Sequence, residues 1–433
     1  MHSLDGELEE FISKAKASGL VVEEKRRFSP LYEPTLYIKS LEERGKIGVF
    51  YVKKTRCAAN LIASRAILYR VLGARNDREA YTRLIHALNN PGRLVEKKFT
   101  DYFREASTSI EDLPAIKFYE KDGGLYITSG VFTACLNGEC NASIHRIMVS
   151  SQGYVAVRVV PRHLYRMLES SKKGLPVAVS IGVNPAILVA AALSPPYGVF
   201  ELKIASSILE APLGVCPTPK YSLPVPCGAS YVIEGVLGPE RRREGPFVDL
   251  LGLYDRVREE PVLKIEEIYE NIVYEKYFHV ILPGGVEHKL LMGFPREAQI
   301  YEAVSKSVAQ VSKVRLTLGG GMWLHAVVSI RKMHDGDGKT AGMAALAAHP
   351  SLKHVVVVDD DIDPDNLAEV EWAIATRLQA SRGIIIVKYA RGSTLDPSSA
   401  DGLTDKIIVD ATAPIASREQ YKKPAIKPLE WES

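Results

Sequence analysis

The 433-residue chain carries 55 lysines and arginines against 52 aspartates and glutamates, and its net charge of +3 is too balanced to indicate nucleic acid or an anionic membrane surface as a partner. Hydrophobic residues make up 46% of the chain and charged residues 25%, which is the profile of a soluble globular protein. The length favours two or three domains over a single hydrophobic core.

The N-terminal segment "MHSLDGELEEFISKAKASGL" predicts an acidic amphipathic helix and not a secretory signal. We therefore expect a cytoplasmic protein whose five cysteines are reduced thiols. Cys135 and Cys140 lie five residues apart, but no second pair at zinc-ligand spacing follows. Structural thiols are therefore favoured over a metal site.

Three regions follow one another along the chain. Residues 1–105 alternate helical patterns with strands such as "IGVFYV", which predicts an N-terminal α/β domain. Residues 106–290 are rich in strands separated by short turns, a pattern typical of a β-barrel or a compact mixed sheet. The amphipathic segment "FPREAQIYEAVSKSVAQV" predicts a linking helix over residues 291–307. Residues 308–433 alternate strands and helices, which predicts a C-terminal α/β domain with a parallel sheet buried on both faces, so the fold class is α/β (α+β).

The longest apolar run, "PVAVSIGVNPAILVAAALSPP", begins at Pro176. Asn184-Pro185 interrupts this run and Gly182 weakens it. We therefore interpret it as a buried strand followed by a helix, and not as a membrane span.

An acidic run, "VVVVDDDIDPDN", follows a predicted buried strand of the C-terminal region. It places Asp359, Asp360, Asp361 and Asp363 at the C-terminal end of four valines. These aspartates could hold a divalent cation or form an acidic turn that caps the next helix, and the residues alone leave both interpretations open.

Several segments together resemble the UbiD family of reversible decarboxylases, which use prenylated FMN. The segments are "NASIHR", "VVPRHL", "YGVFE", "VIEGVLGPERRREGPFVD", "VVVVDDDID", "WAIATR", "LDPSS" and "DKIIVDATAP". Their order is kept from Asp112 to Pro414, whereas the first hundred residues carry less of the resemblance. The resemblance implies that residues 106–290 form a flavin-reductase-like split β-barrel that binds the cofactor.

The resemblance also implies a divalent metal, Mn²⁺ or else Mg²⁺, which is bound by Asn141, His163 and Glu201 and holds the cofactor phosphate. An amide oxygen, a carboxylate and a neutral imidazole make a mostly hard ligand set that suits such an ion. A lone buried Asn or His is more often a satisfied polar core residue, but the combination favours a metal site. A K⁺ ion is implied nearby, with backbone oxygens of residues 194–197 as candidate ligands. The candidate cofactor-binding residues are Asn141, Ser143, Ile144, Arg146, His163, Ser194, Pro195 and Glu201.

The catalytic residues that the resemblance implies are Glu244, Arg146 and Asp249. Glu244 would protonate the substrate carbon after CO₂ leaves, and Arg146 would orient the substrate carboxylate. Asp249 would hold Arg146, because an unpaired buried arginine is costly. Arg146 follows Asn141 by five residues, so the two side chains should point to opposite faces of a regular strand. The role of His145 stays open.

The archaeal branch of the family implies decarboxylation of trans-anhydromevalonate 5-phosphate to isopentenyl phosphate in a modified mevalonate pathway. A hydroxybenzoate or polyprenyl-hydroxybenzoate decarboxylase of quinone synthesis is one alternative, and a non-catalytic flavin-binding module is another. We expect a flavin prenyltransferase as cofactor supplier and a homodimer or higher homo-oligomer, with neither nucleic acid nor a membrane as partner. A phosphorylated substrate would also need an Arg or Lys besides Arg146, for which Arg75, Lys117 and the arginines at 241–243 are candidates without geometric support.

Overall fold

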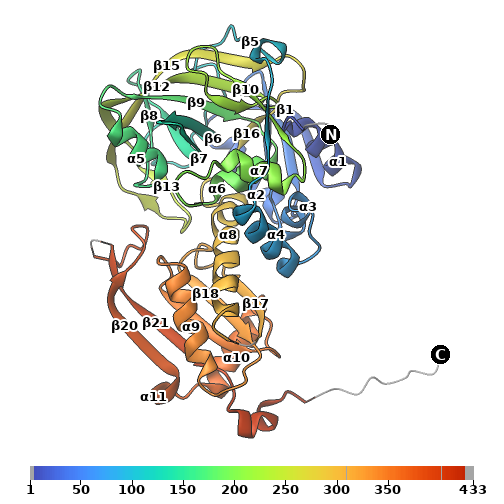
Figure 1. The fold of residues 1–433 in the computed structure, drawn as a ribbon, viewed down its shortest axis with the longest axis vertical. Helices are drawn as coiled ribbons and strands as arrows, with labels where there is room; N and C mark the ends of the chain where they lie inside the picture. Colours follow the sequence, from blue (N-terminus) through green and yellow to red (C-terminus); the bar gives the residue numbers. More distant parts are fainter. Residues whose placement is uncertain (1–3, 309, 401, 425–433) are drawn as a thin grey trace, which may run out of the picture. The chain divides into compact units, whose positions relative to one another are not determined.

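A computed structural model describes residues 4–308, 310–400 and 402–424 (Figure 1). The chain divides into two compact units, residues 1–295 and 296–433. Helix α8 (Val286–Ser305) begins in the first unit and ends in the second, where the sequence predicts a linking helix. The predicted boundary near residue 105 stays a prediction, and residues 425–433 of the predicted C-terminal domain lie outside the described residues.

The N-terminal residues of the first unit form a four-stranded sheet with the order β1-β2-β3-β16. The pairs β1/β2 and β3/β16 are parallel and the pair β2/β3 is antiparallel, so a strand from far along the chain completes this sheet. Helix α1 confirms the predicted N-terminal helix, and α2, α3 and α4 follow in the same region. The bounds are α1 Leu8–Ala17, β1 Val21–Phe28, α2 Glu33–Glu42, β2 Ile47–Val52, β3 Thr55–Ala59, α3 Arg65–Val71, α4 Asp77–Asn89 and β16 Phe278–Val280.

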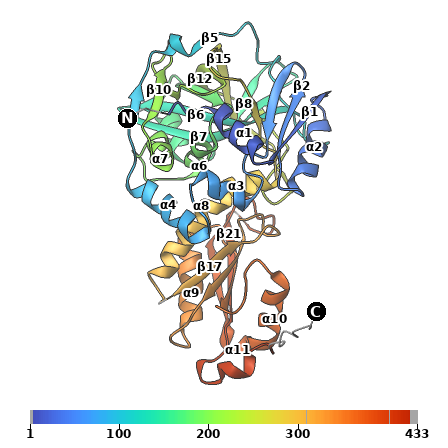
Figure 2. The ribbon, with the colours of Figure 1, turned by 90° about the vertical axis from the view of Figure 1, so that its right-hand side faces the viewer.

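Six antiparallel strands close into a barrel in the middle of the first unit (Figures 1 and 2). Their order is β12-β9-β6-β7-β8-β15, and β15 pairs back with β12, so the barrel has no free edge at this junction. The predicted barrel is therefore confirmed. Its strands are β6 Leu125–Leu136, β7 Glu139–Val149, β8 Val155–Val157, β9 Leu175–Ile181, β12 Tyr231–Glu244 and β15 Arg258–Asn271, with β5 Phe103–Glu105 added beside β15.

Short elements surround the barrel. The small sheet β11-β10-β4 and the pair β13/β14 complete the strands of the first unit, and α5, α6 and α7 are its later helices. Their bounds are β4 Leu94–Glu96, α5 His163–Ser170, α6 Pro185–Ala192, α7 Glu201–Ile208, β10 Leu213–Pro217, β11 Pro224–Pro226, β13 Phe247–Val248 and β14 Tyr254–Asp255.

The long apolar run becomes strand β9 and helix α6, as predicted. Asn184 ends the connection between them and caps α6, because its side chain accepts the backbone N–H of Ala186 at 3.0 Å. Pro185 occupies the first turn of the helix, where a missing N–H costs nothing. Among the described residues, no helix is both long enough and apolar enough to cross a membrane.

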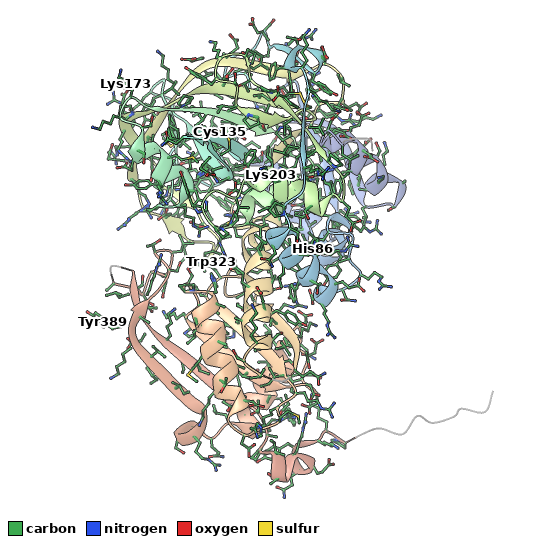
Figure 3. The ribbon with its side chains drawn as sticks, in the orientation of Figure 1. His86, Cys135, Lys173, Lys203, Trp323 and Tyr389 are labelled. Carbon is green, nitrogen blue, oxygen red and sulfur yellow. A yellow bond between two sulfur atoms is a disulfide. The ribbon has the colours of Figure 1, made fainter. Side chains whose placement is uncertain are left out.

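Four of the five cysteines form two disulfides, which makes the expectation of reduced thiols wrong for them. Cys135 lies directly opposite Cys140 in the β6–β7 hairpin (Figure 3), and Cys216 of β10 bonds to Cys227 just beyond β11. Strand pairing brings these side chains within bonding reach, a geometry that the spacing along the chain does not reveal. Cys57 is a free, buried thiol.

The second unit contains a five-stranded sheet with the order β17-β18-β19-β21-β20. Strands β18, β19 and β21 are parallel as predicted, whereas the edge strands β17 and β20 are antiparallel to their neighbours. Each edge strand joins its neighbour without an intervening helix, and such a direct connection reverses the strand direction. The bounds are β17 Val311–Leu316, β18 His325–Ile330, α9 Asp337–Ala348, β19 His354–Asp359, α10 Leu367–Arg377, α11 Ala380–Gly383, β20 Ile384–Arg391 and β21 Leu403–Ala411.

The acidic run after β19 is neutralised by basic side chains of the second unit. Arg377 donates to Asp359 at 2.6 Å and to Asp361 at 2.7 Å. Arg418 pairs with Asp360, and a lysine pairs with the fourth aspartate of the run. Helix α10 is capped by an asparagine and not by these aspartates. The run is therefore an ion-pair network, which neither of the two interpretations from the sequence describes.

Candidate active site

Asn141 and Glu201 meet at the junction of β7 and α7. Asn141 Nδ2 donates to Glu201 Oε1 at 2.8 Å, and the backbone N–H of Ala142 donates to Glu201 Oε2 at 2.7 Å. Both side chains are buried, with 3% and 2% of their surface exposed. Burial raises the pKa of Glu201 to about 7, although hydrogen bonds from Ala142 and Asn141 oppose this rise. A carboxylate in this position would gain from a cation.

Ser143 links Asn141 to His145 along the same face of β7. The Nδ1 atom of His145 lies 2.9 Å from the carbonyl oxygen of Arg158, which can only accept, so Nδ1 carries the proton of the ring. Burial lowers the pKa of His145 to about 4, so the ring is neutral and its Nε2 accepts. The Ser143 hydroxyl, 2.8 Å from that Nε2, therefore donates to His145.

The hydroxyl proton of Ser143 determines whether Asn141 Oδ1 accepts a hydrogen bond. Ser143 Oγ lies 3.1 Å from Asn141 Oδ1, but the hydroxyl cannot donate to both His145 and Asn141. Ser143 Oγ and Asn141 Oδ1 then face each other without a proton between them, and two such oxygen atoms attract a cation. This proton arrangement fits a divalent ion bound through Asn141 Oδ1.

His163 and the segment 194–197 lie together at the start of α5. The ring of His163 contacts the ring of Tyr197 edge-on, with 5.5 Å between centroids, and Arg162 Nη1 donates to Ser194 Oγ at 2.9 Å. Burial, and then the charges of the neighbouring arginines, lower the pKa of His163, so its imidazole is neutral and available as a ligand. Pro195 and the proline after it have no N–H to donate, and the carbonyl oxygen of Pro196 accepts the N–H of Val199 at 3.1 Å.

Arg146 forms a two-point ion pair with Glu244 of β12. Arg146 Nε lies 2.8 Å from Oε1 and Nη2 lies 2.9 Å from Oε2, and none of the Glu244 side chain is exposed. The ring of Phe247 lies against the guanidinium, 4.5 Å away. Burial by itself lowers the pKa of Arg146, but the hydrogen bonds and charge of Glu244 raise it above its ordinary value. Arg146 thus carries a fixed positive charge in a largely buried site.

Side chains on the two faces of β7 make different contacts. Asn141, Ser143 and His145 interact in series on one face, and Arg146 turns to Glu244 on the other, which agrees with the predicted alternation. Ile144 is half-buried in the same strand. The described residues contain no group of three or more His, Cys, Asp or Glu side chains placed for a metal ion, so the candidate metal set depends on the amide of Asn141.

Asp255 is a site residue that the sequence reasoning missed. Its Oδ2 lies 3.6 Å from Arg146 Nη2, and its Oδ1 accepts from Arg258 Nη2 at 2.6 Å. The predicted partner, Asp249, acts on Arg146 through its charge, and its own Oδ1 accepts the backbone N–H of Leu250 at 2.6 Å. The acidic residue beside two basic residues in "YDRVR" was the available signal for Asp255 and Arg258.

Models of one protein family match most of the chain. Residues 93–286 match the Rift-related domain of 3-octaprenyl-4-hydroxybenzoate carboxy-lyase, UbiD, and residues 289–411 match the C-terminal domain of the same family. The chain is 49% identical to the anhydromevalonate phosphate decarboxylase of Aeropyrum pernix, over 87% of this chain and 86% of that protein. A protein of the same name from Methanothermobacter thermautotrophicus is 46% identical over 79% of this chain and 82% of its own length.

A solved structure of similar fold is the UbiD-class enzyme HmfF from Pelotomaculum thermopropionicum in complex with FMN. It has a TM-score of 0.91 and 33% identity to this chain, and the match covers 97% of both chains. An evolved dimeric form of the same enzyme, in complex with prenylated FMN, has a TM-score of 0.88 and 30% identity, again over 97% of both chains. The motifs, the fold and these matches together show that the chain belongs to the UbiD family of carboxy-lyases.

Proposed function

We propose that the chain decarboxylates trans-anhydromevalonate 5-phosphate to isopentenyl phosphate and CO₂. The observation that carries this proposal is the 49% identity, over 87% of the chain, to an archaeal protein named for that phosphate. The phenolic acid decarboxylase of Bacillus subtilis is 29% identical over 89% of the chain, which keeps a hydroxybenzoate as the second candidate substrate. Membership of a carboxy-lyase family removes the support for a non-catalytic flavin-binding module.

The proposal includes prenylated FMN held through a divalent metal. Asn141, His163 and Glu201 would hold Mn²⁺ or Mg²⁺, supported by the free oxygen of Asn141, the neutral imidazole and the buried carboxylate. The carbonyl oxygens of residues 194–197 would hold K⁺ beside the cofactor phosphate. When bound, the cofactor supplies the electron sink for the charge that loss of CO₂ leaves on carbon.

Arg146 and Glu244 would act in turn on the substrate. The guanidinium of Arg146 is occupied by Glu244, and an incoming substrate carboxylate competes for the same two donors. Glu244, whose side chain is fully buried, would act as the acid that gives a proton to the substrate carbon after CO₂ leaves. The charge of Asp255, 3.6 Å from Arg146, keeps the arginine in place during this exchange.

The proposed enzyme is at least a homodimer that assembles through the second unit. Strand β20 is an edge strand and exposes Ile386 (59%), Val387 (38%) and Tyr389 (79%), of which Tyr389 is labelled in Figure 3. A long exposed apolar edge strand is a ready surface for another copy of the chain. A phosphorylated acid does not cross a lipid bilayer unaided, so the proposal includes a cytoplasmic location and a flavin prenyltransferase in the same compartment.

The test uses protein co-expressed with a flavin prenyltransferase, with the bound flavin identified by mass spectrometry. Turnover is then compared for the phosphorylated acid, its dephosphorylated analogue and a hydroxybenzoate, with the product of the first verified as isopentenyl phosphate. We expect the phosphorylated acid to be preferred over the dephosphorylated analogue by about 10²-fold or more in kcat/KM. A preference for the hydroxybenzoate would overturn the proposed substrate and leave the family assignment intact.

A further inference from the structure

Arg258 has unused hydrogen-bond donors in the interior of the first unit. Its side chain is 12% exposed, and Nη2 donates to Asp255 Oδ1 at 2.6 Å. Nε and Nη1 are buried and have no hydrogen-bond partner among the residues that the structure describes. Buried polar groups almost always have partners, so these two donors indicate a water molecule or a ligand beside the guanidinium.

Positive charge is in excess around these donors. Burial lowers the pKa of Arg258, the charge of Asp255 opposes this, and the charges of Arg158, Arg256 and Arg146 lower it further. Arg158 is balanced by Glu260 at 2.6 Å, and Arg146 by Glu244. Among the residues that the structure describes, Asp255 is the one carboxylate paired with Arg258, and it also contacts Arg146. This excess of positive charge favours an anion over a water molecule as the missing partner.

Two observations place Arg258 on the same side of the site as Glu244 and Arg146. Arg258 lies directly opposite Glu244 in the β12–β15 ladder, so the two side chains leave the sheet on the same face. One carboxylate, that of Asp255, contacts both Arg146 and Arg258. The candidate metal residues instead lie on the opposite face of β7 from Arg146. An anion at Arg258 would thus belong to the substrate and not to the metal-bound end of the cofactor.

We propose that Arg258 binds the phosphate group of the substrate, while Arg146 receives its carboxylate. Nε and Nη1 donate on different sides of the guanidinium, so the side chain offers a phosphate its positive charge and a charge-assisted hydrogen bond from one of these donors. Arg258 is then the residue that selects a phosphorylated acid over an uncharged analogue. The inference rests on the proposed function for the identity of the substrate, but the anion site itself stands on the geometry.

The test compares Arg258→Gln with Arg256→Gln in the cofactor-loaded enzyme. Arg256 is two residues away and exposed, so it controls for the loss of one positive charge near the site. We expect Arg258→Gln to lower kcat/KM for the phosphorylated acid by about 10²-fold, mainly through KM, and to change that for the dephosphorylated analogue by less than about threefold. Arg256→Gln should change both by less than about threefold. Equal losses for both acids in Arg258→Gln would overturn the proposal.

Further measurements distinguish the phosphate of the substrate from that of the cofactor, and they control for misfolding of the glutamine variant. Flavin content and bound metal should be unchanged in Arg258→Gln, and their loss would assign Arg258 to the cofactor instead. Arg258→Lys keeps the charge beside Asp255 but not the guanidinium donors, so it should fold even if the glutamine variant does not, and it should show an intermediate KM. A normal KM in the lysine variant would contradict phosphate binding through the guanidinium donors.

Inorganic phosphate distinguishes failure of this inference from failure of the proposed function. It should inhibit the wild-type enzyme competitively with the acid substrate, and inhibition should be about tenfold weaker in Arg258→Gln. If the wild-type enzyme prefers a hydroxybenzoate but still shows phosphate inhibition that depends on Arg258, the proposed substrate fails and the anion site remains. If phosphate inhibits both proteins equally, the anion site fails whatever the substrate is.

Discussion

The ion pair between Arg146 and Glu244 predicts a large loss of stability when one partner is removed. Arg146→Met keeps most of the side-chain volume and removes the two donors at 2.8 and 2.9 Å from Glu244, whose side chain has 0% exposure. Removing one partner of a buried pair costs about 3–5 kcal/mol in the free energy of unfolding, because the other charge stays buried without compensation. Glu244→Gln leaves an acceptor in place and should cost less, about 1.5–3 kcal/mol.

The double variant Arg146→Met/Glu244→Gln tests whether the losses share this cause. Its cost should fall short of the sum of the single variants by about 2 kcal/mol, because no unpaired charge remains. Urea denaturation of the wild type and the three variants measures these free energies of unfolding. Additive losses in the double variant would refute the reasoning.

Four further predictions concern catalysis, metal binding, pH and assembly. Glu244→Gln should keep flavin and metal, measured by absorbance and elemental analysis, and lose decarboxylation by about 10²-fold or more; near-normal turnover would give the acid role to another group. His163→Ala and Glu201→Ala should lose bound Mn²⁺ and flavin together, and retention of both would contradict the proposed ligands. Burial raises the pKa of Glu201 to about 7 in the metal-free protein, so its stabilising protonation is complete in acid and is lost as the pH rises through 7. The melting temperature of the metal-free wild type should therefore fall relative to that of Glu201→Gln between about pH 5 and pH 8, and an equal difference at both would count against this. Light scattering should show at least a dimer for the wild type and a smaller species for Ile386→Asp, whereas a monomeric wild type would exclude the proposed assembly.

Local patterns in the sequence predicted the elements whose formation depends on neighbouring residues. The apolar run with Asn184-Pro185 predicted β9 and α6, because a helix start is fixed by a cap and a proline within a few residues. The odd spacing of Asn141 and Arg146 predicted contacts on two faces of β7, because alternation is a property of one strand. The resemblance carried by the short motifs supplied the family and the candidate residues.

Partners that lie far apart in the chain were decided by the tertiary structure. Composition and compartment argued for reduced thiols, but the pairing of β6 with β7 and of β10 with β11 brings four cysteines into disulfides. The acidic run after β19 looked like a metal site or a helix cap until Arg377, from the end of α10, was seen to neutralise it. In both cases the deciding group comes from another element.

By itself, then, the sequence determined the family, the barrel, the alternation along β7 and the identity of the main candidate residues. Only the tertiary structure decided that Asp255 contacts Arg146, that two Arg258 donors find no partner among the described residues, and that the proton of Ser143 goes to His145. The physical reason is that secondary structure follows from interactions between near neighbours in the chain. Hydrogen-bond partners and buried charge are instead set by groups that only the folded chain brings within about 3–4 Å of one another.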